Sequence, residues 1–158
     1  EMVRRAATEA MSNLIQHQKM VDHLLADKNL KLWLNFAADY EDHYECARAA
    51  AGCLAMATQL PAVAQAIVKL DKFREEMGCL LESGRLEIMH RAFVLLENLV
   101  EHGDATKEAA IKTGLVAFCD AYAQNCQATK DLLDFPEEER SLLPVTEDIA
   151  KKIVRSAA

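Results

Sequence analysis

The chain has 158 residues, of which 51% are hydrophobic, so it is long enough for one domain with a continuous core. Its formal net charge of −7 disfavours non-specific binding to nucleic acid or to an anionic membrane, and no apolar run is long enough to cross a membrane. Five glycines, three prolines and few aromatic residues do not suit a β-sandwich, whereas abundant alanine, leucine, glutamate and lysine favour an all-α fold.

Apolar spacing and helix-breaking residues divide the chain into a series of predicted helices. Pro61 stands where the first turn of a helix tolerates proline, and Gly103 ends a long apolar helix. The expected helical ranges are 2–18, 20–26, 30–39, 43–60, 62–70, 72–82, 85–102, 104–113, 115–133 and 146–158. The range 115–133 is expected to hold one or two helices.

The regular pattern fails before the last of these helices. Pro136 and Pro144 bracket an acidic segment, which we expect to be a connector over residues 135–144. Residues 145–158 are expected to form a capping helix, because a stacked helical array needs an atypical last unit to close its core against water. The chain opens on Glu1 without an initiator or a helix-start signal. We therefore expect residues 1–158 to be a single segment of a larger domain.

One stretch of sequence occurs three times, as RAATEAMSNL (5–14), RAAAGCLAMA (48–57) and HRAFVLLENL (90–99). The steps from Arg5 to Arg48 and from Arg48 to His90 are 43 and 42 residues. The apolar positions follow the i, i+3, i+4, i+7 spacing of one helix face. They are Ala7, Ala10, Met11 and Leu14, then Ala50, Cys53, Leu54 and Ala57, then Ala92, Leu95, Leu96 and Leu99. A helical unit that returns every ~40–47 residues predicts a right-handed armadillo or HEAT-like superhelical solenoid, here of about three and a half three-helix repeats.

The sequence does not contain the usual signatures of a catalytic, metal or cofactor site. Its five histidines form no HxxxH or HExxH pair, and P-loop, GxGxxG and GxSxG motifs are missing. Its five cysteines are odd in number and contain no CxxC, which indicates a reducing, cytoplasmic compartment. We expect these cysteines to be buried small hydrophobes. The prediction is a protein that is not an enzyme and needs no cofactor or metal.

The candidate binding residues are positions of the repeated stretch that lie outside its apolar stripe. In a stacked array, equivalent positions of neighbouring units line up on a concave surface. The predicted groove consists of Arg5, Glu9, Asn13, Arg48, Met56, His90 and Asn98. Its basic residues would contact acidic groups of an extended segment, and its asparagines would bond the backbone of that segment.

A structural interpretation of the same residues stands beside this one. An arginine near a helix start can be solvated, and Asn13 can tie down an adjacent loop. Gly52, inside a predicted helix, costs about 1 kcal/mol relative to alanine. Close approach by a neighbouring helix explains this glycine better than access for a ligand.

Three stretches of the sequence resemble one protein family. They are RRAATEAMSNLIQH (4–17), ARAAAGCLAMAT (47–58) and HRAFVLLENLV (90–100). Their amino-acid sequences resemble the C-terminal armadillo repeats of the UCS-domain proteins, the myosin-directed chaperones of the Unc-forty-five type. The resemblance covers roughly residues 2–125. Generic armadillo proteins share the period but not the AAAGxLAM and HRxxxxxxNL patterns.

The resemblance implies a non-enzymatic co-chaperone that binds the myosin motor domain as its folding client. It also implies a heat-shock chaperone partner, recruited through an N-terminal tetratricopeptide module that is absent from this chain. The client groove carried over by the resemblance contains Asn13 and Asn98, with Arg5, Arg48 and His90 as neighbours. Met56 interrupts the row of amides at the middle position.

Two other functions fit the sequence. The chain could be a general armadillo adaptor that binds a linear peptide of another partner. It could also be a purely structural section of a long solenoid, in which case the isolated chain is expected to self-associate through the uncovered face of its first helix.

Overall fold

The computed structural model describes residues 2–26, 28–132 and 135–158, and these ranges contain helices but no strand. The prediction of an all-α fold is therefore confirmed. The helices are α1 (Met2–Asn13), α2 (Gln18–Leu25), α3 (Asn29–Ala38), α4 (Tyr44–Ala57), α5 (Pro61–Ile67), α6 (Phe73–Leu81), α7 (Leu86–Glu101), α8 (Asp104–Lys112), α9 (Leu115–Leu132), the 3-10 helix η1 (Glu137–Leu142) and α10 (Leu143–Ala157). In the described part of the chain, no helix combines the length and apolar character needed to span a bilayer.

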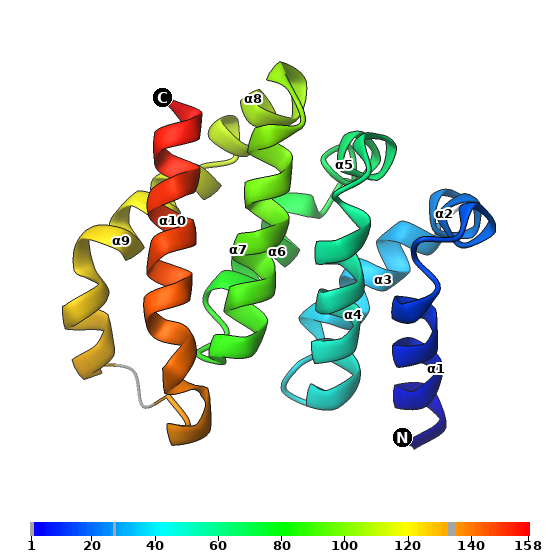
Figure 1. The fold of residues 1–158 in the computed structure, drawn as a ribbon, viewed down its shortest axis with the longest axis horizontal. Helices are drawn as coiled ribbons and strands as arrows, with labels where there is room; N and C mark the ends of the chain where they lie inside the picture. The colour runs from blue at the N-terminus through cyan, green and yellow to red at the C-terminus, as the bar shows by residue number, and fades with distance from the viewer. Residues whose placement is uncertain (1, 27, 133–134) are drawn as a thin grey trace.

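Four helices lie side by side as a row of rods, in the order α1, α4, α7 and α10 (Figure 1). In this row α4 packs against α1 and α7, and α10 packs against α7. Each later rod also packs against the helix that comes before it in the same part of the chain: α3 against α4, α6 against α7 and α9 against α10. The short helices α2, α5 and α8 lie near the same end of the rods, toward the top of the view (Figure 1).

The repeated apolar stripe forms the core of the two inner rods. On α4 and α7 all eight of its predicted positions are buried, which confirms the stripe for these helices. In the first stretch the prediction is wrong for Ala7 and Ala10 of α1 and for Leu14, which follows α1, because all three are exposed, Leu14 at 46%. Because α4 packs against one side of α1, only the side with Thr8 and the partly buried Met11 is covered.

Glycine and proline set the predicted breaks between helices. Gly103 and Gly114 have φ angles of 124° and 79°, a left-handed backbone that glycine adopts without a steric penalty, and they separate α7, α8 and α9. Pro61 is in the first turn of α5, where its missing N–H needs no partner. Helix α1 ends at Asn13, five residues earlier than the range 2–18 expected from the apolar pattern.

The predicted connector over residues 135–144 contains helical structure. Residues 137–142 form η1, and α10 begins at Leu143 rather than near Thr146, because Pro144 is tolerated in the first turn. Helix α10 lies beside α7 as the fourth rod of the row (Figure 1). Lys152 on α10 joins the two rods through ion pairs with Glu97 and Glu101, at 2.5 and 2.8 Å.

Candidate functional site

A surface hollow of about 610 Å³ lies between the first three rods, and we call it the α1–α4–α7 hollow. Five of the seven predicted groove residues line it: Glu9, Asn13, Arg48, Met56 and His90. The remaining lining residues are Ser12, Ala49, Gly52, Ala55, Arg91 and Val94. These five positions of the repeated stretch lie around one hollow. Arg5 and Asn98 are not among the lining residues.

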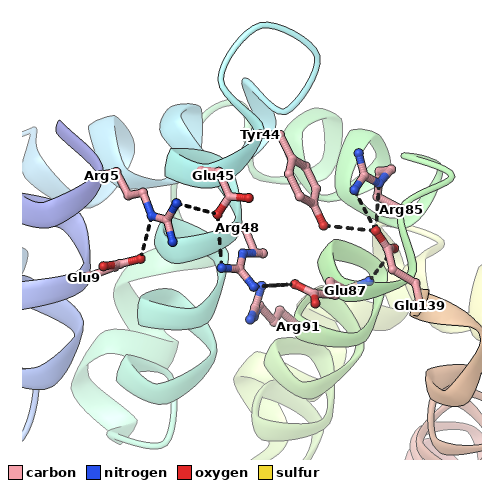
Figure 2. A network of polar contacts seen from close by, with 9 residues as sticks. All are labelled: Arg5, Glu9, Tyr44, Glu45, Arg48, Arg85, Glu87, Arg91 and Glu139. Atoms are coloured by element: carbon pink, nitrogen blue, oxygen red, sulfur yellow. Dashed lines mark hydrogen bonds and ion pairs between the residues drawn. The ribbon is translucent and has the colours of Figure 1, made fainter. Parts of the chain in front are cut away.

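Alternating charges join the three rods along this hollow (Figure 2). On α1, Arg5 pairs with Glu9 at 2.9 Å and reaches Glu45 of α4 at 3.6 Å. On α4, Arg48 pairs with the same Glu45 at 3.1 Å and with Glu87 of α7 at 3.0 Å. These five residues and Arg91 are the charge ladder. Because each of these side chains is 28–47% exposed, solvent screens the pairs, and we expect the ladder to fix register more than it stabilises the fold.

The ladder changes the electrostatics predicted for the groove. The hydrogen bond to Glu9 raises the pKa of Arg5, and the hydrogen bond to Glu87 raises the pKa of Arg48, so both stay charged. Burial, and then the charge of Arg91, lowers the pKa of His90 below its ordinary value of 6.5. His90 is therefore largely neutral at pH 7, and the expected basic row of Arg5, Arg48 and His90 carries two charges there rather than three.

Arg91 is a lining residue that the sequence interpretation missed. Its side chain crosses Gly52 of the neighbouring rod, because a Cβ atom added at Gly52 would lie 3.3 Å from Arg91 Nε. Its Nη1 atom is buried without a hydrogen-bond partner, and it lies 3.6 Å from Glu87. The helical glycine was the available signal, since it predicted a close approach from a neighbouring helix. The glycine alone could not show that the neighbouring group is the Arg91 guanidinium rather than a helix backbone.

The Gly52 position allows one direct test of this contact. We expect Gly52→Ala to raise the free energy of unfolding slightly, by less than about 1 kcal/mol, because alanine favours the helix and the flexible end of Arg91 can move a few tenths of an ångström. Gly78 of α6 is the matched control, since a Cβ there would meet no neighbour within 4 Å. Urea unfolding followed by circular dichroism measures both variants. A loss of stability at Gly52 alone would mean that Arg91 is held rigidly.

Asn98 serves the contact between rods instead of the hollow. Its side chain is 9% exposed, and its Nδ2 donates hydrogen bonds to the Ala55 carbonyl at 2.8 Å and to Thr58 Oγ1 at 3.1 Å. Asn98 therefore has a structural role, because its amide joins α7 to α4. Asn13, in the same register on α1, is exposed and lines the hollow.

A second polar cluster lies beside the hollow and consists of Glu139, Arg85, Tyr44 and the Glu87 backbone (Figure 2). Glu139 is 3% exposed, and its Oε1 accepts hydrogen bonds from Arg85 at 2.7 and 3.0 Å and from the Tyr44 hydroxyl at 3.1 Å. Its Oε2 accepts the Glu87 N–H at 3.2 Å. Burial alone would raise the pKa of Glu139, but these hydrogen bonds outweigh burial and lower it. We call this the Glu139 cluster.

The described residues contain no cluster of three or more His, Cys, Asp or Glu residues that could hold a metal ion. Cys46, Cys53 and Cys119 are buried, as predicted, whereas Cys79 is exposed, and the Cys126 side chain is outside the described part. Burial raises the pKa of Cys53 to about 11 and that of Cys119 to about 12, so both thiols stay protonated near neutral pH and are poor nucleophiles. What the hollow offers chemically is a binding surface of charged, amide and apolar side chains.

Comparison with known proteins identifies relatives of most of the chain. It is 33% identical over 120 residues to Protein unc-45 homolog B of Danio rerio, a match that covers 73% of this chain and 13% of that protein. The corresponding protein of Xenopus tropicalis is 34% identical over 116 residues, which is 71% of this chain and 12% of the relative. The human protein is 32% identical over 104 residues, 63% of this chain and 11% of the relative. No family model and no solved structure matches. The chain is thus homologous to a short segment of the unc-45 homolog B proteins.

Proposed function

We propose that the chain is a client-binding segment of a myosin-directed co-chaperone and that it holds the myosin motor domain through the α1–α4–α7 hollow. One observation carries this proposal. Five residues chosen from the repeated stretch, and from the resemblance to UCS-domain proteins, line one hollow across three successive rods. The similarity to the unc-45 homolog B proteins supports the same family.

The proposal includes an architecture. The row of α1, α4, α7 and α10, with one packed helix behind each later rod, supports a right-handed armadillo-type solenoid over residues 1–158. In this interpretation η1 lies within the connector 135–144, and α10 provides the fourth rod that closes the core. An exposed row of equivalent positions is the surface such an array offers to a partner.

The hollow suits an extended segment of the client. Met56, which is 41% exposed, and the partly buried Val94 both line the hollow and offer apolar contact to the client. Asn13 provides an amide that can donate to and accept from a peptide backbone. Arg48 provides a charge, whereas Asn98 holds the wall of the hollow in place. This role needs no catalysis and no cofactor. A heat-shock chaperone would join in the cytoplasm through a tetratricopeptide module outside these 158 residues.

The double variant Asn13→Ala/Met56→Ala is expected to weaken binding of a purified myosin motor domain by about tenfold, or ~1.4 kcal/mol. Both side chains are exposed, so the fold should be retained. Biolayer interferometry with the immobilised chain measures the affinity. Leu32→Ala is the matched control, because Leu32 is a similarly exposed apolar residue, at 47%, on α3. The double variant should suppress heat aggregation of the motor domain less than the unaltered chain does, whereas the control variant should suppress it equally well.

Equal binding by the double variant and the control would contradict the groove assignment. If the unaltered chain does not bind the myosin motor domain, the proposal that the motor domain is the client is contradicted. Binding of unrelated linear peptides with indifference to the motor domain would support the general adaptor instead.

A further inference from the structure

Arg91 is the cation of the hollow with the weakest compensation by carboxylates. Arg5 has Glu9 at 2.9 Å, and Arg48 has two carboxylates at 3.1 and 3.0 Å. Among the described residues, the one carboxylate paired with Arg91 is that of Glu87 at 3.6 Å, beyond hydrogen-bond distance, and the same Oε2 atom is already 3.0 Å from Arg48. One carboxylate therefore serves two guanidinium groups, and Arg48 has the closer contact.

The surroundings of Arg91 disfavour an uncompensated charge. Its Nη1 atom is buried and makes no hydrogen bond. Burial lowers the pKa of Arg91; the Glu87 carboxylate raises it in part, and the positive charge of Arg48 lowers it again. A buried donor without an acceptor carries a desolvation cost that an incoming anion would remove. Nη1 itself is covered, but the side chain as a whole has 28% of its surface exposed and lines the hollow, so an anion can approach the guanidinium from the hollow.

We propose that Arg91 is the centre of a carboxylate subsite in the α1–α4–α7 hollow, which binds an aspartate or glutamate side chain of an extended protein segment. A planar guanidinium pairs with a carboxylate through two parallel hydrogen bonds, which a single ammonium cannot reproduce. Met56 and Val94 lie on the same hollow and would contact an apolar residue next to the acidic one. The subsite therefore selects an apolar–acidic pair.

This inference deepens the proposed function, because it specifies which chemistry of the client the hollow recognises. Glu9 lies on the α1 side of the hollow, so a second acidic residue there would be repelled. The rest of the chain is acidic, with a net charge of −7, and does not by itself attract an acidic partner. Recognition of a carboxylate must then come from local donors, which are the guanidinium groups of Arg91 and Arg48.

Nuclear magnetic resonance of the 158-residue chain can test the subsite with three blocked tetrapeptides, Gly-Leu-Glu-Gly, Gly-Leu-Gln-Gly and Gly-Leu-Lys-Gly. The glutamate peptide should shift the Arg91 Nε–H and Gly52 amide signals in a saturable manner. The glutamine and lysine peptides should bind at least about tenfold more weakly, because they lack the charge that Arg91 pairs with. Equal shifts with the glutamate and glutamine peptides, or no saturable shift with the glutamate peptide, would overturn the inference.

Three variants separate recognition from folding. Arg91→Gln should abolish the difference between the glutamate and glutamine peptides, and Arg91→Lys should retain part of it. Arg74→Gln removes an exposed arginine on α6 and should behave as the unaltered chain does. If Arg91→Gln disturbs the fold, the amide spectrum shows it, and Arg91→Lys then decides the question: an undiminished preference for glutamate in that variant overturns the bidentate subsite.

The subsite and the proposed function can fail separately. Motor-domain binding that depends on Asn13 and Met56 but not on Arg91 would refute the subsite and leave the client in place. Selective binding of the glutamate peptide without any binding of the motor domain would refute the proposal that the motor domain is the client, but it would support the subsite.

Discussion

Glu139→Ala is expected to lower the free energy of unfolding by about 3 kcal/mol, because it removes the acceptor of a buried ionic cluster. The variant leaves the Arg85 guanidinium, the Tyr44 hydroxyl and the Glu87 N–H without the carboxylate they all bond. Arg85 also lies over the Tyr44 ring, 3.6 Å from its centroid, and loses the group that fixes it there. The effect is expected at the low end of values for buried ion pairs, because Arg85 keeps 34% of its side chain in solvent.

Urea unfolding followed by circular dichroism at 222 nm gives the free energies for this comparison. Glu138→Ala is the matched control, since Glu138 lies in the same 3-10 helix but is exposed. We expect the control to change the free energy of unfolding by less than about 0.5 kcal/mol. Similar values for the two variants would mean that the Glu139 cluster contributes nothing beyond a solvated charge.

The difference between the unaltered chain and Glu139→Ala should depend on pH. The cluster lowers the pKa of Glu139 in the folded chain relative to an ordinary glutamate, whose pKa is 4.5. The charged carboxylate therefore stabilises the fold fully above the unfolded pKa, and this contribution is lost as the pH falls through the lower folded pKa. The difference in unfolding free energy should be constant near neutral pH and shrink below about pH 4. A difference that grows on acidification would contradict this sign.

Asn98→Ala is expected to lower the free energy of unfolding by about 2 kcal/mol. The substitution removes two buried hydrogen bonds between α7 and α4, those to the Ala55 carbonyl and to Thr58 Oγ1. The Thr58 hydroxyl keeps its own bonds to the Leu54 and Ala55 carbonyls, which limits the loss.

Asn13→Ala is the control for the same comparison, because Asn13 holds the equivalent register position but is exposed. Its free energy of unfolding should stay within about 0.5 kcal/mol of the unaltered chain. Guanidinium unfolding of the three chains distinguishes the two asparagines. Equal effects at both positions would show that the Asn98 amide contributes little to the contact between rods.

The apolar pattern of the sequence was enough to predict the helices and the inner core. The stripes on α4 and α7 are buried because helical periodicity is local and each of these rods has a rod on both sides. The burial of the stripe on α1 could not be predicted in the same way. Whether Ala7, Ala10 and Leu14 are covered depends on which helices flank α1, and the pattern within α1 contains no such information.

The polar contacts were much less predictable. Three consecutive glutamates, 137–139, look alike in the sequence, yet only Glu139 is buried, because one turn of η1 points it at α7. Its partners lie 52 to 95 residues away along the chain. Asn13 and Asn98 share a register position but differ in burial. Asn98 is covered because α4 packs against its side of α7, whereas no described rod covers Asn13 on α1. Arg91 lies one residue from the predicted His90, and only the crossing of α7 over α4 brings it to Gly52.

Glu87 links the Glu139 cluster to the charge ladder. Its backbone N–H is bonded to Glu139, and its carboxylate is bonded to Arg48 at the floor between α4 and α7. The η1 helix, which lies between α9 and α10 in the chain, is thus joined to Arg48 through the single residue Glu87. A substitution in η1 is therefore expected to act at a distance on the α1–α4–α7 hollow, through the position of Arg48.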